Sequence, residues 1–198
     1  MSEPIGVVVL AAGQGSRFRQ LAGDQKDKLL ADCTGRDGVV RSVIEHALMN
    51  LPETLDRRIL VTTPDRPQVI RLAEDYGCES VLIGSTGMGD SIAAGVSAFA
   101  QLGGWLMVLG DMPFILPSSI EQVVAQVCDD CISVPVQEGK YGHPVGFGRH
   151  FAQGLMALSG ERGARPLFAQ GRVVEVTVAD PGVLWDVDVP EALIYRTA

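Results

Sequence analysis

The sequence lacks long hydrophobic runs and is poor in basic residues, and each shortage excludes some functions. No stretch reaches the roughly 18–20 consecutive apolar residues that a membrane-spanning helix needs. Basic residues number 16 against 24 acidic ones, so the formal net charge of the 198 residues is −8. An acidic surface repels nucleic acids and anionic membranes, and we expect neither as a partner. The first residues carry no basic segment of the kind that opens a signal peptide, so the expected location is the cytoplasm.

Cysteine is also scarce. The chain has Cys33, Cys78, Cys128 and Cys131, and only the last two are close in sequence. The second pair that a four-cysteine zinc site needs is missing, and the pattern is unlike a secreted disulfide framework. Cys131 opens an apolar run typical of a buried strand, which favours a structural role. A redox or metal role for the CxxC pair is the alternative.

Two common nucleotide-binding signatures are absent. The chain contains no GxxxxGK[ST] sequence, and Gly13-Gln-Gly15 is followed by Ser-Arg-Phe, which does not complete the GxGxxG of a dinucleotide fold. A Rossmann-type dehydrogenase is therefore disfavoured.

Strand-like and helix-like segments alternate along the chain. Continuous apolar runs predict buried strands at residues 5–10, 58–62, 105–109 and 131–136. Further strands are predicted at residues 79–83 and 173–178. Helical spacing and capping signals predict helices at residues 39–51, 67–76, 90–102, 118–127, 162–170 and 190–195. Repeated βα units indicate a single three-layer α/β domain over residues 1–198, Rossmann-like, with a mostly parallel twisted sheet and helices on both faces. Ligands bind such sheets beyond the carboxyl ends of the strands.

A glycine-rich loop follows the first predicted strand. Small residues let the backbone approach a ligand closely, and successive N–H groups in such a turn form an anion-binding nest. Arg17 adds a cation with several donors. The loop suits a triphosphate, although an ordinary tight turn is the alternative. Its candidate residues are Leu10, Ala11, Ala12, Gly13, Gly15 and Arg17.

A lysine and several acids form the next group of candidates. Lys28 would neutralise charge on a leaving pyrophosphate, with Lys26 as a competitor. Asp111 follows a predicted strand, between Gly and Pro, and is well placed to carry Mg²⁺. Asp186 and Asp188 alternate along an extended segment, so only one of them can share a metal with Asp111.

Three further motifs are weaker. The turn that opens the predicted helix at 90–102 offers either capping groups or free N–H groups for a ligand; its residues are Gly87, Gly89, Asp90 and Ser91. His143 lies in a glycine-rich loop, where it would hydrogen-bond a polar substrate or an acceptor phosphate. Arg162 and Arg165 flank a glycine and would hold an acceptor phosphate.

Taken in order, these motifs resemble the molybdenum cofactor cytidylyltransferase family, within the nucleotidyltransferases that include molybdopterin guanylyltransferase. The matching segments cover nearly the whole chain: LAAGQGSR, DKLLA, GMGDSIAAG, LGDMP, GKYGHPVGF, SGERGAR and DVDVPEAL. The LAAG sequence is more similar to the CTP branch than to the LAGG of the guanylyltransferases. This sequence departs from the family in one respect. In the family, the arginine of the glycine-rich loop and the phosphate lysine are separated by only a few residues. The longer spacing between Arg17 and Lys28 leaves the choice between Lys26 and Lys28 open.

The resemblance implies transfer of CMP from CTP to the phosphate of molybdopterin, with release of pyrophosphate. Arg17, Lys28 and Asp111 would be catalytic. The glycine-rich loop, Lys28 and the 87–91 turn would bind the nucleotide, and His143 and the two arginines of SGERGAR would face the acceptor. Asp111 and Asp188 would bind Mg²⁺. A molybdenum hydroxylase or its maturation factor is the further partner implied. A guanylyltransferase, a sugar-phosphate nucleotidyltransferase and a non-catalytic cofactor-binding chaperone remain alternatives.

Overall fold

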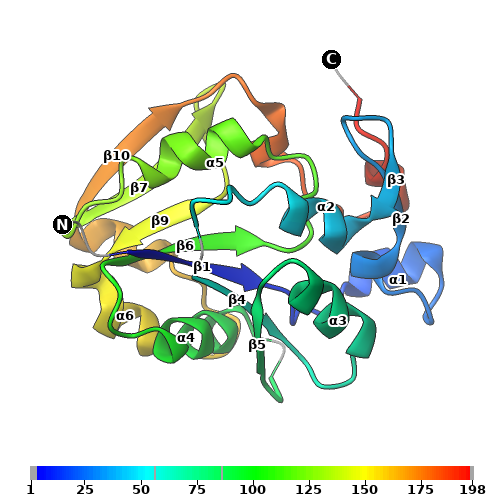
Figure 1. Ribbon diagram of the computed structural model, residues 1–198, viewed down its shortest axis with the longest axis horizontal. Helices are drawn as coiled ribbons and strands as arrows, with labels where there is room; N and C mark the ends of the chain where they lie inside the picture. The colour runs from blue at the N-terminus through cyan, green and yellow to red at the C-terminus, as the bar shows by residue number, and fades with distance from the viewer. Residues whose placement is uncertain (1–3, 56, 86, 197–198) are drawn as a thin grey trace.

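One eight-stranded mixed sheet forms the centre of the protein in the computed structural model, which describes residues 4–55, 57–85 and 87–196 (Figure 1). The strand order is β10-β7-β9-β6-β1-β4-β5, and β8 pairs with β7. Neighbouring strands are parallel except where β9 and β8 pair with the strands beside them. The strands are β1 Ile5–Leu10, β4 Arg58–Thr62, β5 Glu79–Leu82, β6 Gly104–Leu109, β7 Cys131–Gln137, β8 Lys140–Tyr141, β9 Val145–Gly148 and β10 Arg172–Thr177.

The three central strands end at the same edge of the sheet. Leu10 of β1 pairs in register with Leu109 of β6 and with Val61 of β4. The link continues past the strands, because Gly110 donates its N–H to the carbonyl of Leu10 at 3.0 Å. The loops that leave β1 and β6 are therefore neighbours at the carboxyl edge.

Helices cover both faces of the sheet, because side chains alternate along each strand. Val7 and Val9 of β1 join the core under α2 (Val43–Met49), α3 (Pro67–Asp75) and α5 (Pro117–Val124). Val8 points the other way, into the core under α4 (Met88–Ala98) and α6 (Ala152–Met156). Figure 1 shows α4 and α6 on one side of the sheet and α5 on the other. The predicted α/β fold is confirmed.

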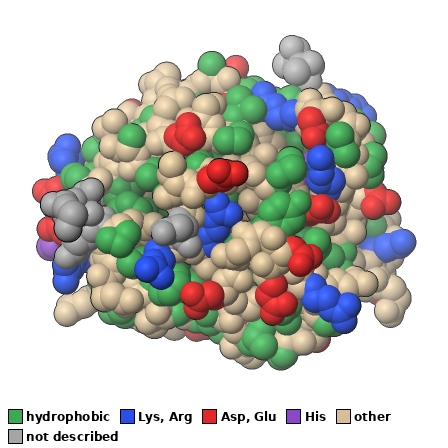
Figure 2. All heavy atoms as spheres, viewed as in Figure 1, with side chains coloured by type: hydrophobic (Ala, Val, Ile, Leu, Met, Phe, Trp, Pro, Cys, Tyr) green, Lys and Arg blue, Asp and Glu red, His purple; other side chains and the backbone are tan. Residues whose placement is uncertain are grey.

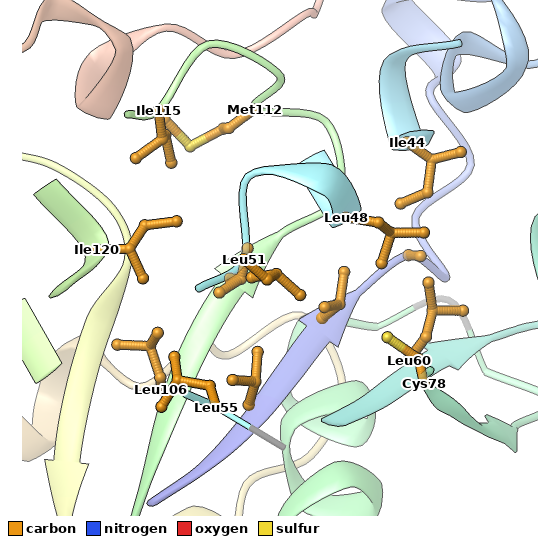
Figure 3. Close-up of a cluster of buried hydrophobic side chains, with 14 of the residues drawn as sticks. Ile44, Leu48, Leu51, Leu55, Leu60, Cys78, Leu106, Met112, Ile115 and Ile120 are labelled. Atoms are coloured by element: carbon orange, nitrogen blue, oxygen red, sulfur yellow. The ribbon is translucent and has the colours of Figure 1, made fainter. Parts of the chain in front are cut away.

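The hydrophobic core between α2 and the sheet holds the central strands in place. Figure 3 shows Ile44 and Leu48 of α2 above Leu60 of β4 and Leu106 of β6. Burying each such side chain contributes about 1.5–3 kcal/mol. A Cβ on Gly110 would lie 2.9 Å from Cδ1 of Ile44, so the chain after β6 packs directly against α2.

A smaller unit lies beside the carboxyl edge. The antiparallel strands β2 (Asp32–Thr34) and β3 (Val40–Ser42) pack with α1 (Ser16–Ala22) around Phe18, Cys33 and Phe114. A bridge between Thr34 and Ile194 adds the C-terminal segment to this unit. The 3-10 helices are η1 Lys28–Leu30, η2 Arg149–Phe151, η3 Arg165–Gln170, η4 Pro181–Leu184 and η5 Pro190–Leu193.

Several predicted boundaries are wrong. The helix expected at 39–51 is a strand followed by α2, because the Ser42 side chain caps the helix by accepting from the N–H of Glu45. Residues 16–22, for which no helix was predicted, form α1, and residues 28–30 form η1. The helices expected at 162–170 and 190–195 are short 3-10 turns.

The cysteine pair forms the turn into β7. Cys128 donates its N–H toward Sγ of Cys131 at 3.0 Å, and that sulfur contacts the carbonyl of Gln126 at 3.1 Å. Cys131 is buried, and its burial raises the pKa of the thiol to about 11. A protonated, buried thiol supports the structural role expected for it.

The surface carries charge of both signs. Figure 2 shows acidic and basic side chains interspersed over the face seen in Figure 1. Within the described ranges, none of the helices combines the length and apolar character that crossing a membrane requires.

Candidate active site

The glycine-rich loop connects β1 to α1. Its first residue stays in the sheet pattern, since the Ala11 N–H donates to the carbonyl of Val61 at 2.8 Å. Gly15 has a left-handed backbone, with φ of 62° and ψ of 38°, which favours glycine. A Cβ there would lie 3.2 Å from Cγ and Cδ of Lys28. The loop therefore passes closely over the stem of this lysine.

Four charged side chains from separate parts of the chain converge beside this loop. The Lys28 Nζ lies 2.5 Å from Oδ2 of Asp111 and 3.2 Å from Oδ1 of Asp188. The other oxygen of Asp188 accepts from Nη1 of Arg17 at 3.0 Å. Asp111 comes directly from the end of β6, and its carbonyl accepts the N–H of Val187 at 2.9 Å, which holds the 186–188 segment alongside. The sequence predicted these four residues as site members, and the structure brings them together.

The electrostatics explain how a lysine can be buried here. Burial lowers the pKa of Lys28, but the carboxylates of Asp111 and Asp188 outweigh that effect, and the net pKa is raised. Burial likewise raises the pKa of Asp188, and Lys28 and Arg17 reverse the effect, so its net pKa is lowered. The site thus holds an ammonium between two carboxylates. Lys26, the alternative, is exposed.

The two acids of the 186–188 segment are not equivalent. Asp188 bonds to Lys28 and Arg17. Burial and repulsion by Asp188 raise the pKa of Asp186 instead. The geometry therefore favours Asp188 as the partner of Asp111.

A pocket of about 180 Å³ opens beside this cluster. It lies between the glycine-rich loop, the η1 turn, the start of α4 and the end of β6. The pocket residues are Leu10, Ala11, Ala12, Gly13, Lys28, Leu29, Met88, Ser91, Leu109, Asp111 and Glu161. Of these, Leu29, Met88, Leu109 and Glu161 were not singled out from the sequence. Nothing in the local pattern marks Glu161, because exposed acids are common.

The predicted nucleotide turn at the start of α4 packs against the SGERGAR segment. Gly89 donates its N–H to the carbonyl of Gly160 at 2.8 Å, and the Gly160 N–H donates to Asp90 at 3.1 Å. Asp90 also accepts from the hydroxyl of Ser85, and the Ser91 hydroxyl bonds back to the carbonyl of Gly87. Capping by Asp90 or Ser91, one of the two alternatives for this turn, does not occur, because Gly87 is the N-cap residue and none of the described side chains caps the helix. Ser91 alone of these two residues lines the pocket.

We expect Gly89→Ala to lower the melting temperature by several degrees. The new Cβ would lie 2.6 Å from the carbonyl oxygen of Arg162 and 2.7 Å from the nitrogen of Ser159, which are backbone atoms with little freedom to move. Such overpacking costs about 1–3 kcal/mol, or roughly 2–4 °C per kcal/mol for a chain of this size. Thermal unfolding measures the change.

Gly84→Ala is the matched control, because apart from the chain neighbours of Gly84, none of the described residues has a heavy atom within 4 Å of the Cβ position there. A Gly89→Ala protein as stable as the wild type would contradict the close approach of the two segments, since alanine otherwise favours a helix over glycine.

The predicted acceptor residues occupy different environments. The Nδ1 of His143 is buried and, among the described residues, has no hydrogen-bond partner. Burial lowers the pKa of this imidazole, with the carboxylate of Asp111 opposing the effect. His143 is thus near the charged cluster and poised to accept or donate one bond. Arg162 and Arg165 are exposed, and the structure does not bring them into the lysine–carboxylate cluster.

A buried carboxylate anchors the segment that carries Asp188. One oxygen of Asp180 accepts from Nη1 of Arg36 at 2.6 Å and from the N–H of Gly182, and the other accepts from Leu116 and Ser119. Leu116 and Ser119 follow the loop that begins at Asp111. The anchor therefore joins the two carboxylate-bearing segments to the β2–β3 hairpin. No local pattern in the sequence marks this anchor.

The donor set fits a divalent cation with oxygen ligands. Asp111 and Asp188 each direct an oxygen at one cation, the Lys28 ammonium. Mg²⁺ and Mn²⁺ favour carboxylate oxygens, and Mg²⁺ commonly takes one or two of them together with substrate phosphates and water. In the described ranges no group of three or more His, Cys, Asp or Glu is placed to hold a metal. Two carboxylates therefore suit an ion shared with a phosphate substrate.

The α/β sheet, the glycine-rich loop after its first strand, and a lysine with two carboxylates at its carboxyl edge define a nucleotidyltransferase fold. The chain belongs to the MobA-like NTP transferase domain family, whose model matches residues 7–176.

Solved structures share this fold. A nucleotidyl transferase from Methanothermobacter thermautotroptrophicus is 22% identical, with a TM-score of 0.80 over 96% of this chain and 94% of that one. Rv0371c from Mycobacterium tuberculosis, in complex with manganese, is 23% identical, with a TM-score of 0.68 over 97% and 96% of the two chains. Among curated proteins, the bifunctional protein GlmU of Solibacter usitatus is 27% identical over 152 residues, or 75% of this chain. The chain spans only 31% of that relative's length.

Proposed function

We propose that this protein transfers a nucleoside monophosphate from an NTP to a phosphorylated acceptor, with CTP as the nucleotide and molybdopterin as the acceptor. One observation carries the proposal: Lys28, Asp111 and Asp188 meet within 3.2 Å at a pocket whose wall is the glycine-rich loop. Membership of the MobA-like family supports the transfer of a nucleotide. The LAAG sequence of the loop supports CTP.

The reaction needs no nucleophilic side chain and no general base. A phosphate oxygen of the acceptor attacks the α-phosphorus of the NTP, a new P–O bond forms, and the bond to the β-phosphate breaks as pyrophosphate leaves. A phosphate monoester is already anionic near neutral pH. Catalysis then consists of holding the reactants in line and stabilising the charge that develops.

The chain's own residues supply both contributions. Backbone N–H groups of the glycine-rich loop bind the triphosphate, and the Lys28 ammonium neutralises charge on the leaving pyrophosphate. Arg17, exposed at the start of α1, adds a second cation at the same edge. Asp111 and Asp188 would hold a divalent ion that would supply further charge neutralisation, and the manganese in the Rv0371c structure supports such an ion.

The acceptor would lie on the other side of the pocket. The Nδ1 of His143 has no partner among the described residues but is buried, so it would bond the acceptor only once it became accessible. Arg162 and Arg165 supply exposed cations on the segment that packs on α4. A molybdenum hydroxylase or its maturation factor would then receive the product.

A sugar phosphate is the second candidate acceptor. The curated relative reported above is a GlmU protein, and this similarity supports the sugar phosphate as the alternative to the pterin.

Pyrophosphate release tests the proposal directly. The purified protein with Mg²⁺ would be given CTP, GTP, ATP or UTP, each with Mo-molybdopterin, with a hexose 1-phosphate or with no acceptor, and EDTA reactions serve as blanks. We expect release with CTP only when the pterin is present. Release with the sugar phosphate would establish a sugar-phosphate nucleotidyltransferase. A preference for GTP would identify a guanylyltransferase. No release with any pair would overturn the proposal in favour of a binding protein if calorimetry still showed CTP binding.

A further inference from the structure

Arg66 is a buried arginine that bonds to the back of the glycine-rich loop. It follows β4 and immediately precedes α3, and only 6% of it is exposed. Its Nη1 donates to the carbonyl of Ala11 and its Nη2 to the carbonyl of Gly13, both at 2.7 Å. The hydroxyl of Thr62 donates to the Ala11 carbonyl as well, at 3.1 Å. Two carbonyls of the loop are thus fixed by one rigid guanidinium.

Fixing these carbonyls also fixes the adjacent amides. In a planar trans peptide, the N–H of a residue points opposite to the carbonyl of the residue before it. With the carbonyls of Ala11 and Gly13 directed at Arg66, the N–H groups of Ala12 and Gln14 point away from it. Neither amide donates to another backbone group in the described part of the chain. Two donors are therefore held in one direction by a cation behind the loop.

The same guanidinium reaches the turn that carries the lysine. Its Nε lies 3.3 Å from Oδ2 of Asp27, and the other oxygen of Asp27 caps η1 by accepting the N–H of Leu29 at 3.0 Å. Lys28 lies between these two residues. Arg66 consequently connects the glycine-rich loop with the turn whose ammonium sits between Asp111 and Asp188.

We propose that Arg66 is a positioning residue for phosphate binding: through the carbonyls of Ala11 and Gly13 and through Asp27, it aims the loop amides and holds the Lys28 turn. Arg66 itself does not touch the substrate. This inference rests on the proposed function, because it takes the glycine-rich loop as the site of the triphosphate. Orientation requires the planar fork of arginine, which a lysine ammonium cannot reproduce.

The test measures binding of two probes by calorimetry: inorganic tripolyphosphate, and CTP with Mg²⁺. We expect Arg66→Lys to weaken both about tenfold and Arg66→Met about tenfold to a hundredfold, since each misdirected amide loses a hydrogen bond to a charged phosphate. The KM for the nucleotide should rise by a similar factor while kcat changes less. If Arg66→Met does not fold, Arg66→Lys and Asp27→Asn decide the matter, with Asp27→Asn expected to weaken both probes.

Arg58→Lys is the matched control. Arg58 is the first residue of β4, the strand that precedes Arg66 in the chain. At that opposite end of β4 it donates to four backbone carbonyls, those of Leu51, Pro52, Leu55 and Tyr76. This variant should keep wild-type affinity for both probes even where its melting temperature falls. A purely structural role for Arg66 would make the two arginines behave alike.

The outcomes separate the inference from the function on which it rests. Wild-type affinity in both Arg66 variants would overturn the positioning role and leave the proposed function intact. A wild-type protein that binds tripolyphosphate but not CTP would overturn the nucleotide assignment, while the effect of Arg66 could still be measured. A wild-type protein that binds neither probe would overturn both.

Discussion

Asp111→Asn is expected to lower kcat/KM for pyrophosphate release by about a thousandfold or more. Asparagine keeps the shape of the side chain and removes its charge, so the Lys28 ammonium loses its nearer anion and a divalent ion loses one of two ligands. Loss of roughly 4 kcal/mol of charge stabilisation in the transition state corresponds to a factor of about a thousand. Steady-state kinetics with CTP, or with whichever nucleotide the wild type prefers, give the number.

Two other variants make this result specific. Asp188→Asn should cause a loss of similar size, because Asp188 is the second carboxylate on Lys28. Asp186→Asn, two residues away on the same segment, should change the rate only a few-fold. Folding should survive Asp111→Asn, since the bond to Val187 uses the backbone carbonyl of Asp111. Near-wild-type turnover by a folded Asp111→Asn protein would remove Asp111 from the site.

Lys28→Met is expected to reduce kcat by about a hundredfold to a thousandfold. The substitution keeps an apolar stem against Gly15 but leaves the leaving pyrophosphate without its cation, an effect comparable to loss of one preorganised donor. It also leaves Asp111 and Asp188 facing each other without the ammonium between them. Single-turnover kinetics at saturating nucleotide separate the chemical step from binding.

Lys26→Met tests the choice between Lys26 and Lys28, which the sequence leaves open. Lys26 lies two residues earlier and is exposed, so its loss should change kcat less than about threefold, as for a surface charge screened by solvent. If Lys26→Met proved the more damaging of the two variants, the phosphate lysine would have been misassigned.

The buried strands were predictable because their residues carry the signal locally. The run at residues 5–10 matches β1, and the run at 105–109 matches all but the first residue of β6. Once both strands are assigned, the carboxyl-edge rule places the glycine-rich loop and Asp111 together without further information. The α1 segment was missed because residues 16–22 bury only Phe18 and have no capping side chain at their start.

The finer organisation of the site could not be predicted, because its contacts are long-range. The sequence favours Lys28 but leaves Lys26 as a competitor, and only folding shows which one points at the carboxylates. Arg36 and Asp180 are separated by 144 positions, and Arg66 bonds to Gly13 across 53. Single residues in such pairs carry no local pattern that marks a partner.

The position of Asp180 in chain order has a consequence for biogenesis. Arg36, Leu116 and Ser119 all precede it in the chain, as Arg17 and Lys28 precede Asp188. During translation, the central strands can pair while residues 180–188 are still inside the ribosome, because chains fold progressively as they are made. The carboxylate pair is completed only when that segment emerges and returns over the sheet. A nascent chain would therefore pair its central strands before it completes the carboxylate pair of the candidate active site.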